Sequence, residues 1–232
     1  MVLGVDERKD TAMIYDALLA LPLFTGMSLS ELRNIISKTK VDFGKSAKGK
    51  TIIKSGQRCG KLIFIISGQV MSTATAEGRL YSVGETLNAP MAIEPQAVFG
   101  RFQEYTRTVK AVTETSMMTI DKNEIFKLIS HSLIIRINFV NIFATKLQKM
   151  DQALWRKPYA EDELELKISD FIRVHCATPV GEKQIHIKMQ TLAEILNTKR
   201  IYISEALNAM QARGLISLSR GKIDVPELKN LA

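Results

Sequence analysis

The sequence has few of the residues that build metal centres and disulfide frameworks. Among 232 residues there are only two cysteines and three histidines. Cys59 and Cys176 lie far apart and form no CxxC pair, so one chain cannot assemble a zinc finger or a cysteine-ligated iron-sulfur cluster. The pattern predicts two reduced thiols in a reducing compartment and no metal site.

Long apolar runs and an apolar N-terminus are also missing. The most apolar stretch, LIFIISGQV from Leu62, is shorter than the roughly 18 residues of a membrane span. The first ten residues, MVLGVDERKD, are charged where a secretory signal would be apolar. We therefore expect a cytoplasmic protein with no membrane partner.

The composition is that of a globular, basic protein. It is 46% hydrophobic and 24% charged, which argues against a wholly disordered chain. The net charge of +8 favours a polyanionic partner, either nucleic acid or an anionic membrane surface. Charge alone does not decide between them.

Residues 41–120 alternate in polarity and are punctuated by glycine, after a helical N-terminal stretch at 10–40 in which Ser28 and Glu31 form a capping box. Many short strands at this spacing predict a small β-barrel or sandwich. This stretch contains no histidine, and three of its glutamates, Glu94, Glu104 and Glu114, have no evident partner. We therefore expect no barrel enzyme and no catalytic residue.

A long helix is predicted from His131 to Lys157, ended by Pro158. Its apolar residues follow heptad spacing, which favours a parallel two-chain seam; the alternative is that this face packs on the barrel. A polar residue in the seam could fix its register. The seam comprises Leu133, Ile137, Val140, Ala144, Leu147, Asp151 and Leu154.

The stretch MQTLAEILNTKRIYISEALNAMQARGLI predicts two short helices joined by a tight turn, the pattern of a helix-turn-helix. Small Ala193 would let the second helix cross the first closely. The residues expected to be buried are Leu192, Ile195 and Leu196 in the first helix and Ile203, Leu207 and Met210 in the second.

The start of the second helix is the predicted DNA-reading surface. Thr198 is the expected N-cap, with Lys199, Arg200 and Tyr202 on the exposed side of the first turn. Arg200 could bond guanine O6 and N7, and Lys199 a phosphate. Glu205 could accept from a cytosine amino group or orient Arg200.

A wing is predicted after the two helices. GLISLSRGKIDVPE indicates a hairpin with Arg220 and Lys222 at its tip, where they could contact phosphates. The alternative is a basic turn that is only solvated. The complete predicted DNA-contact set is Gln190, Thr198, Lys199, Arg200, Tyr202, Ser204, Glu205, Arg220 and Lys222.

These motifs resemble the Crp/Fnr family of bacterial transcription regulators over nearly the whole chain. KGKTIIKSGQRCGKLIFIISGQV is similar to the family's early barrel signature, with Gly49, Gly56 and Gly68 at corner positions. The second helix is similar to its reading helix, with Arg200 at the guanine-contacting arginine. The resemblance implies an α+β fold: N-terminal helices and a cyclic-nucleotide-binding-like β-roll (a jelly-roll barrel) at 1–130, a long dimerisation helix at 131–158, and a winged helix-turn-helix at 159–232.

The family's ligand cassette is altered here. Its Gly-Glu pair for the ribose falls on about Ala89 and Pro90, and its Arg-Ser pair for the phosphate on Tyr105 and Thr106. Without a cation the phosphate would be buried unpaired, so cyclic AMP is not the expected effector, although Arg107 could substitute. The candidate effector pocket is Ala89, Pro90, Met91, Tyr105, Thr106, Arg107, Met150 and Asp151.

The resemblance implies a homodimeric regulator of transcription with duplex DNA and a second copy of itself as partners. RNA polymerase stays open as a further partner. No cofactor is predicted; another small effector stays open, as does haem with His131 or His175 as axial ligand. The rival hypothesis is a ligand- or nucleotide-binding regulatory module without DNA-binding function.

Overall fold

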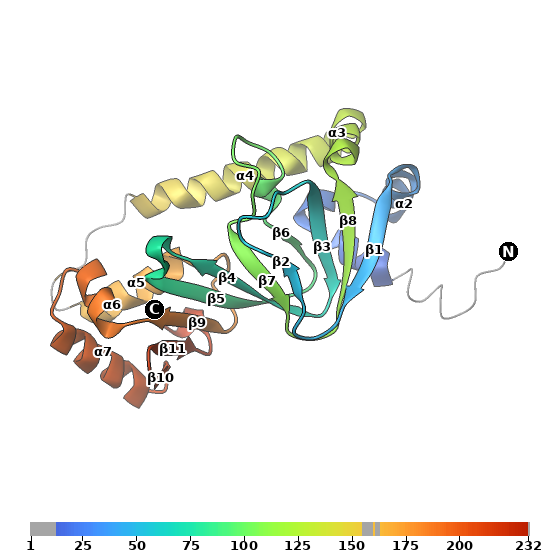
Figure 1. Ribbon diagram of the computed structural model, residues 1–232. Coiled ribbons are helices and arrows are strands. Elements are labelled where there is room, and N and C mark those ends of the chain that lie inside the picture. Colours follow the sequence, from blue (N-terminus) through green and yellow to red (C-terminus); the bar gives the residue numbers. More distant parts are fainter. Residues whose placement is uncertain (1–12, 155–159, 161–162, 232) are drawn as a thin grey trace. The chain divides into compact units, whose positions relative to one another are not determined.

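The computed structural model describes residues 13–154, 160 and 163–231, with the backbone alone for 149, 153 and 154. The chain packs as two compact units (Figure 1). The first combines Met1–Val70 with Asn88–Gln152, and the second combines Met71–Leu87 with Ala153–Ala232. Each unit is therefore built from two separate stretches of chain.

The N-terminal part of the first unit is helical at 13–19, in the 3-10 turn η1 (Pro22–Phe24) and in α2 (Leu29–Lys38). The predicted capping box is confirmed: the Ser28 hydroxyl accepts from the Glu31 amide, and the Glu31 carboxylate accepts from the Ser28 amide at 2.8 Å. These hydrogen bonds lower the pKa of the Glu31 carboxyl. They fix where α2 begins.

Short antiparallel strands form the β-roll predicted for the first unit. One sheet has the order β1-β8-β3-β6, and in the other β7 lies between β2 and β4. The sequence did not single out β1 or β6 as strands. The bounds are β1 (Val41–Ser46), β2 (Thr51–Ile53), β3 (Lys61–Ser67), β4 (Gln69–Thr75), β6 (Met91–Ile93), β7 (Arg107–Ala111) and β8 (Thr115–Asp121).

The corner between β3 and β4 requires glycine. Gly68 has a φ of +95°, in the left-handed region that other residues avoid. A Cβ atom at this position would also collide with the carbonyl oxygen of Glu114. Both the backbone angle and the close approach explain why glycine stands at this predicted corner.

Two helices follow the β-roll, α3 (Lys122–His131) and α4 (Leu133–Leu154), so the predicted long helix begins two residues later than expected. Its predicted end near Pro158 lies outside the described residues. No single helix in the described ranges is long and apolar enough to cross a membrane; α3 and α4 reach that length only as a pair bent by 116°.

The second unit contains the predicted winged helix-turn-helix and one element the sequence reading did not assign to it. Its strands form a sheet in the order β10-β11-β9-β5-β4, so a hairpin from residues 71–87 extends the wing sheet (Figure 1). The bounds are β5 (Tyr81–Asn88), α5 (Leu164–Val174), β9 (Lys183–Ile187), α6 (Met189–Ile195), α7 (Arg200–Ala212), β10 (Ser217–Ser219) and β11 (Lys222–Val225), with 3-10 turns η2 (Glu77–Arg79) and η4 (Leu228–Leu231).

The hairpin contributes to the core of this unit. Val83 of β5 is 1% exposed and packs in one cluster with side chains of α5, α6, α7 and the wing strands. Glu85 of β5 and Lys183 of β9 are both fully buried and form an ion pair with an N–O distance of 3.2 Å. The second unit therefore depends on residues that precede α4 in the sequence.

The helix-turn-helix core agrees with the sequence except at one position. Leu192, Ile203, Leu207 and Met210 are buried as predicted, and Ala193 is buried too. Ile195 was predicted to be buried and is 42% exposed: it is the last residue of α6, and the adjacent Leu196 contacts the core instead. Leu196 is partly buried against the same cluster.

The predicted boundary at residue 159 can be tested with a fragment of residues 159–232. This fragment lacks Val83 and Glu85, so Lys183 would be buried without its partner, at a cost of about 3 to 5 kcal/mol. That approaches the stability of a small domain, so we expect no cooperative thermal transition by circular dichroism. The same fragment with Lys183→Met should regain part of the transition. If the unmodified fragment of residues 159–232 melted as cooperatively as a protein that also contains the hairpin, the expectation would be contradicted.

Candidate nucleic-acid interface

The turn between α6 and α7 is closed by the backbone. Asn197 adopts a left-handed conformation, with a φ of +49°, and the Thr198 amide donates to the Ala193 carbonyl at 2.9 Å. Ala193 is 1% exposed, which leaves room for α7 to cross α6 closely. The predicted tight turn is thus formed as expected for a helix-turn-helix.

The N-cap of α7 is Lys199, not Thr198 as predicted. The Lys199 carbonyl accepts the first hydrogen bonds of α7, from the amides of Tyr202 and Ile203, so Thr198 belongs to the turn and the helix begins one residue later. Lys199 makes no side-chain cap, and the first turn of α7 contains no acidic residue. Its amide groups and positive helix dipole can therefore receive an anion.

The first turn of α7 presents its cations to solvent. Lys199 and Arg200 are exposed, and Tyr202 is 49% exposed, while Ile203 on the opposite side is fully buried. Ile201 was not among the predicted DNA contacts. It is 56% exposed beside Arg200 and could contact a thymine methyl group. Its only signal in the sequence is an apolar residue on the polar side of the helix.

The remaining predicted contact residues on the two helices differ in exposure and in whether their side chains already have a partner. The Gln190 amide donates to the Glu194 carboxylate at 3.0 Å, and Ser204 is half-buried. Glu205 is exposed and lines a hollow with Thr198, Tyr202, Ala206 and residues 163–166. Among the described residues Glu205 forms no ion pair with Arg200, so the predicted orienting role is not seen.

The wing hairpin is formed as predicted. β10 pairs with β11 in the register Ser219↔Lys222, and Gly221 at its tip has a φ of +71°. Arg220 is exposed at this tip. Lys222 pairs with Asp224 at 2.7 Å, so its charge is partly balanced within the wing, and Arg220 is the stronger candidate for a phosphate contact.

The altered ligand cassette has its own internal partners. Tyr105 is 4% exposed and its hydroxyl donates to the Lys61 carbonyl at 3.0 Å; burial raises the pKa of that hydroxyl. The Thr106 amide and hydroxyl donate to the Glu94 carboxylate at 2.8 and 2.5 Å. Glu94, for which the sequence showed no partner, thus occupies donors that an anionic ligand would use.

Two cations lie near this carboxylate. Desolvation lowers the pKa of the Lys146 ammonium group on α4. The negative charge of Glu94 raises this pKa, and the positive charge of Arg107 lowers it further. Arg107 is half-buried at the start of β7. Glu94 and Arg107 are therefore both close enough to Lys146 for their charges to act on it, a grouping that the sequence did not reveal.

The other candidate pocket residues range from half-buried to exposed. Met91 pairs with Ile65 in the sheet and is half-buried, as is Ala89, whereas Pro90 is exposed. Met150 and Asp151 have exposed side chains near the end of α4. The structure therefore groups Thr106 with Glu94 through hydrogen bonds, and Glu94 and Arg107 with Lys146 through charge, and neither Met150 nor Asp151 belongs to this group.

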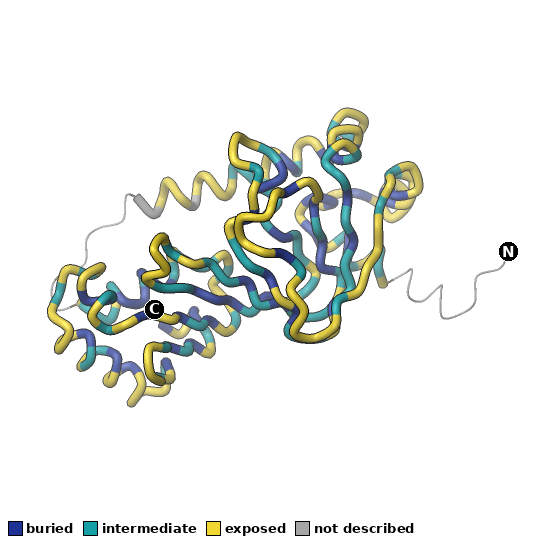
Figure 2. Tube along the Cα trace, in the orientation of Figure 1, coloured by how far each residue is buried: buried dark blue, intermediate teal, exposed yellow. Residues whose placement is uncertain are grey.

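The predicted seam faces solvent along α4 (Figure 2). The aliphatic residues are 49 to 65% exposed at Ile137, Val140 and Leu147, while Asp151 is exposed and Ala144 half-buried. The side chain of Leu154 lies outside the described residues. The alternative, that this face packs on the barrel, does not hold for these side chains in the first unit.

The opposite face of α4 holds it to the first unit. The rings of Phe99, Phe139 and Phe143 stack edge to face in series, with centroids 5.3 and 4.9 Å apart. The Asn138 amide donates to the carbonyls of Leu23 and Thr25 at 3.1 and 2.8 Å. α4 is thus anchored on one side and apolar but exposed on the other.

The two histidines considered as haem ligands have other partners. His175 contacts the Tyr81 hydroxyl through Nε2 at 2.9 Å and the Phe171 carbonyl through Nδ1 at 2.7 Å. His131 contacts the Lys127 carbonyl through Nδ1 at 2.7 Å. His175 could bind a metal only by giving up one of these contacts, which indicates a structural role.

Known proteins resemble both units of this chain. Residues 45–132 match the family model of the cyclic nucleotide-binding domain, and residues 165–232 match that of the Crp-like helix-turn-helix domain. No curated protein sequence matches the chain.

Several solved structures are similar over most of their length. Thermus thermophilus Catabolite Activator Protein is 22% identical, with 90% of this chain and 96% of that chain covered and a TM-score of 0.47. A putative crp/fnr family regulator from Eubacterium rectale is 20% identical, with 90% and 95% covered and a TM-score of 0.49. DNR from Pseudomonas aeruginosa is 16% identical, with 100% and 98% covered and a TM-score of 0.44. These values are too low to transfer a ligand or an operator.

The two family models match in the order of the observed elements, a β-roll followed by a winged helix-turn-helix, and together they take in well over half of the chain. The chain therefore belongs to the Crp/Fnr family of DNA-binding transcription regulators.

Proposed function

We propose that the protein is a homodimer that reads a near-palindromic operator with α7 under the control of a signal received by the β-roll. The observation that carries this proposal is the start of α7, where Lys199 and Arg200 are exposed while Ile203 is buried. Helices of this kind lie in the major groove with their first residues at base edges. Two of them in a dimer would contact half-sites about 34 Å apart.

Different cations would serve different purposes in this complex. Arg200 in the first turn of α7 can make a forked pair of bonds to guanine, which distinguishes sequences. Lys199 at the N-cap and Arg220 at the wing tip suit phosphates, which add affinity and salt dependence. Glu205, Gln190 and Ser204 remain proposed secondary contacts.

The exposed stripe on α4 supports the homodimer. Ile137, Val140 and Leu147 leave apolar surface in water along one face of a helix whose other face is already packed. A second α4 in parallel would bury this stripe, as heptad spacing requires. Because the stripe continues the predicted heptads, a second copy of the chain is the occupant we propose.

The effector is not cyclic AMP under this proposal. Tyr105 is buried and its hydroxyl is engaged, and Thr106 already binds the Glu94 carboxylate. A nucleotide phosphate would have to displace that carboxylate and would meet its negative charge. Another small effector in the β-roll is the signal we propose, with cytoplasmic location and contact with RNA polymerase as further predictions.

A ligand-binding module without DNA-binding function is the rival. A module that only binds a ligand has no need of a winged unit with exposed cations at the start of α7 and at the wing tip. The family consists of transcription regulators, and we propose no enzymatic activity. Salt-dependent binding to duplex DNA separates the two hypotheses, because only the regulator requires it.

Replacing Arg200 and Lys199 separately tests direct readout. With an operator selected from random duplexes, Arg200→Ala should weaken binding by about tenfold to a hundredfold and relax preference at one base pair. Lys199→Ala should weaken all sequences alike and lower the salt slope by about one. Lys229→Ala removes one charge from the exposed C-terminal end and is the control. Unchanged base preference in Arg200→Ala would contradict its assignment.

A charge placed in the α4 stripe tests the dimer. Val140 is 61% exposed in the single chain, so Val140→Glu should leave the subunit folded while burying a carboxylate in the seam. We expect sedimentation velocity to show a monomer at micromolar concentration. Asn141→Glu, at the exposed neighbouring position off the seam, should remain a dimer. A dimer in both variants would remove the seam.

Equilibrium dialysis with labelled cyclic AMP tests the altered cassette. We expect no saturable binding at micromolar nucleotide, because Glu94 holds the Thr106 donors. Arg107→Ala is the companion variant. Saturable binding to the wild-type protein that is lost in Arg107→Ala would show that Arg107 substitutes for the missing cation.

A further inference from the structure

The β4–β5 hairpin is part of the sheet that carries the wing. β5 pairs antiparallel with β9 over five residues, from Tyr81↔Ile187 to Glu85↔Lys183, and β9 pairs with β11 on its other side. Gly84 permits close packing inside the hairpin, because a Cβ there would lie 3.1 Å from the Met71 sulfur. The hairpin therefore completes one edge of the sheet in the DNA-binding unit.

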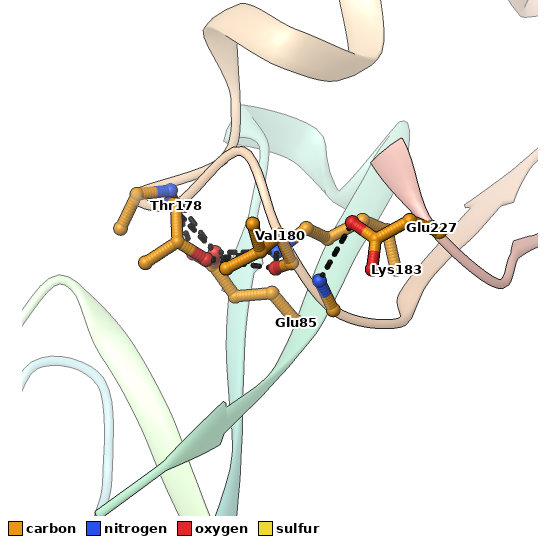
Figure 3. A network of polar contacts seen from close by, with 7 residues as sticks. Glu85, Thr178, Val180, Lys183 and Glu227 are labelled. Carbon is orange, nitrogen blue, oxygen red and sulfur yellow. Dashed lines mark hydrogen bonds and ion pairs between the residues drawn. The ribbon is translucent and has the colours of Figure 1, made fainter. Parts of the chain in front are cut away.

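A polar network fixes this edge (Figure 3). The Lys183 ammonium donates to the Glu85 carboxylate at 3.2 Å, to the Thr178 hydroxyl at 3.1 Å and to the Val180 carbonyl at 2.9 Å. Glu85 also accepts from the amide of Ala177 at 2.9 Å. The hairpin thus contacts both β9 and the loop that joins α5 to β9.

The chemistry of the pair suggests a purpose other than stability. Glu85 and Lys183 are both 0% exposed, and a buried ion pair adds little stability relative to apolar residues of similar size. Removing one partner leaves an uncompensated buried charge and is strongly unfavourable. The pair therefore makes the pairing of β5 with β9 specific. Either β5 pairs with β9 in the one register that joins Glu85 to Lys183, or β5 separates and both charges return to water.

A second contact ties the hairpin to the end of α5. The Tyr81 hydroxyl lies 2.9 Å from Nε2 of His175, and the Tyr81 ring packs edge-on against Phe171 with centroids 5.4 Å apart. Phe171 is 7% exposed and belongs to the core that includes Leu207 of α7. Movement of β5 would therefore disturb α5 as well as β9.

Both contacts lead directly to the reading helix. β9 ends at Ile187, and α6 begins at Met189 after the single residue Lys188. α6 and α5 both pack against α7, and Glu165 of α5 contacts Arg213 at the C-cap of α7. The hairpin is thus bonded to α5, which packs against α7, and to β9, which leads into α6.

The other end of β5 leads into the candidate effector pocket. β5 ends at Asn88, which is followed at once by Ala89, Pro90 and Met91. The Gln69 side-chain amide donates to the Asn88 side-chain oxygen at 2.8 Å, at the base of the hairpin. Residues 89–91 are therefore continuous in the chain with the strand that carries Tyr81 and Glu85.

We propose that the hairpin of residues 71–87 couples the β-roll to the reading head, with Glu85 and Tyr81 as positioning residues. Docked on β9, it holds α5 and α6 in the arrangement that presents α7 to DNA; released, it leaves that arrangement loose. The exposed starts of α7 and the wing stay uncovered by the hairpin, so docking is compatible with DNA binding. This inference rests on the proposed DNA-reading function.

Hydrogen exchange on the full-length protein without DNA tests the docking itself. In Glu85→Gln, amides of residues 82–86 and 183–187 should exchange together and on the order of a hundredfold faster than in the wild type. Amides of β3 and β8 should be unchanged. Glu77→Gln removes the same charge from the exposed hairpin tip and is the matched control. Unchanged exchange of residues 183–187 in Glu85→Gln would overturn the proposal.

The coupling to DNA has a readout that a purely structural strand would not give. If docking favours DNA binding, operator DNA must favour docking by the same factor. We expect operator to slow exchange of residues 82–86 in the wild type by about tenfold. Tyr81→Phe, which removes only a hydroxyl, should weaken operator binding severalfold while the fold is retained.

The outcomes separate this inference from the proposed function. Operator binding with increased protection of α7 but no change at residues 82–86 would overturn the coupling and leave DNA reading intact. A wild-type protein that binds no duplex with a salt dependence would overturn both. Full operator affinity in Glu85→Gln would likewise remove the positioning role.

Discussion

A single ion pair shielded from water, between Glu85 and Lys183, determines how the DNA-binding unit is assembled. Its two residues are 98 positions apart in the sequence, and both are completely buried. Neither charge can be buried alone, so the two stretches of chain must come together for either to fold. The position of β9, and through it that of α6, depends on this pairing.

The long helix illustrates how one element can serve two neighbours. Its inner face is fixed by Asn138 and by stacked phenylalanine rings, which are specific contacts that cannot slide. Its outer face carries the exposed aliphatic side chains of Ile137, Val140 and Leu147. Because the inner face of α4 is fixed on the first unit, the helix cannot rotate about its axis. The β-roll therefore determines which way the apolar stripe on the outer face points.

Local patterns in the sequence predicted the features that are determined locally. The capping box at Ser28, the glycine corner at Gly68, the turn before α7 and the wing all follow from spacing over a few residues. The predicted N-cap of α7 was wrong by one residue, because the Lys199 carbonyl accepts the first bonds of α7 while the Thr198 amide bonds back to α6. Propensity could not show that competition between two helix ends.

Features that depend on distant partners were not predictable. Glu94 and Glu85 are isolated glutamates in the sequence, and only the fold reveals that they meet Thr106 and Lys183. The strand pattern around β5 gave no sign of which sheet edge it would join. Alternation predicts that a strand exists, but pairing over long separations depends on the whole core.

The β4–β5 hairpin also bears on how such regulators can be recombined. Because its residues interrupt the β-roll in the chain yet complete the sheet beside the wing, the two units are joined covalently at three places, at 70/71, 87/88 and 152/153. A chimera made by one splice after α4 would give the new head a foreign edge strand. A foreign head grafted onto this chain would thus have to bring its own edge strand, and this head moved elsewhere would need its hairpin or an apolar residue in place of Lys183.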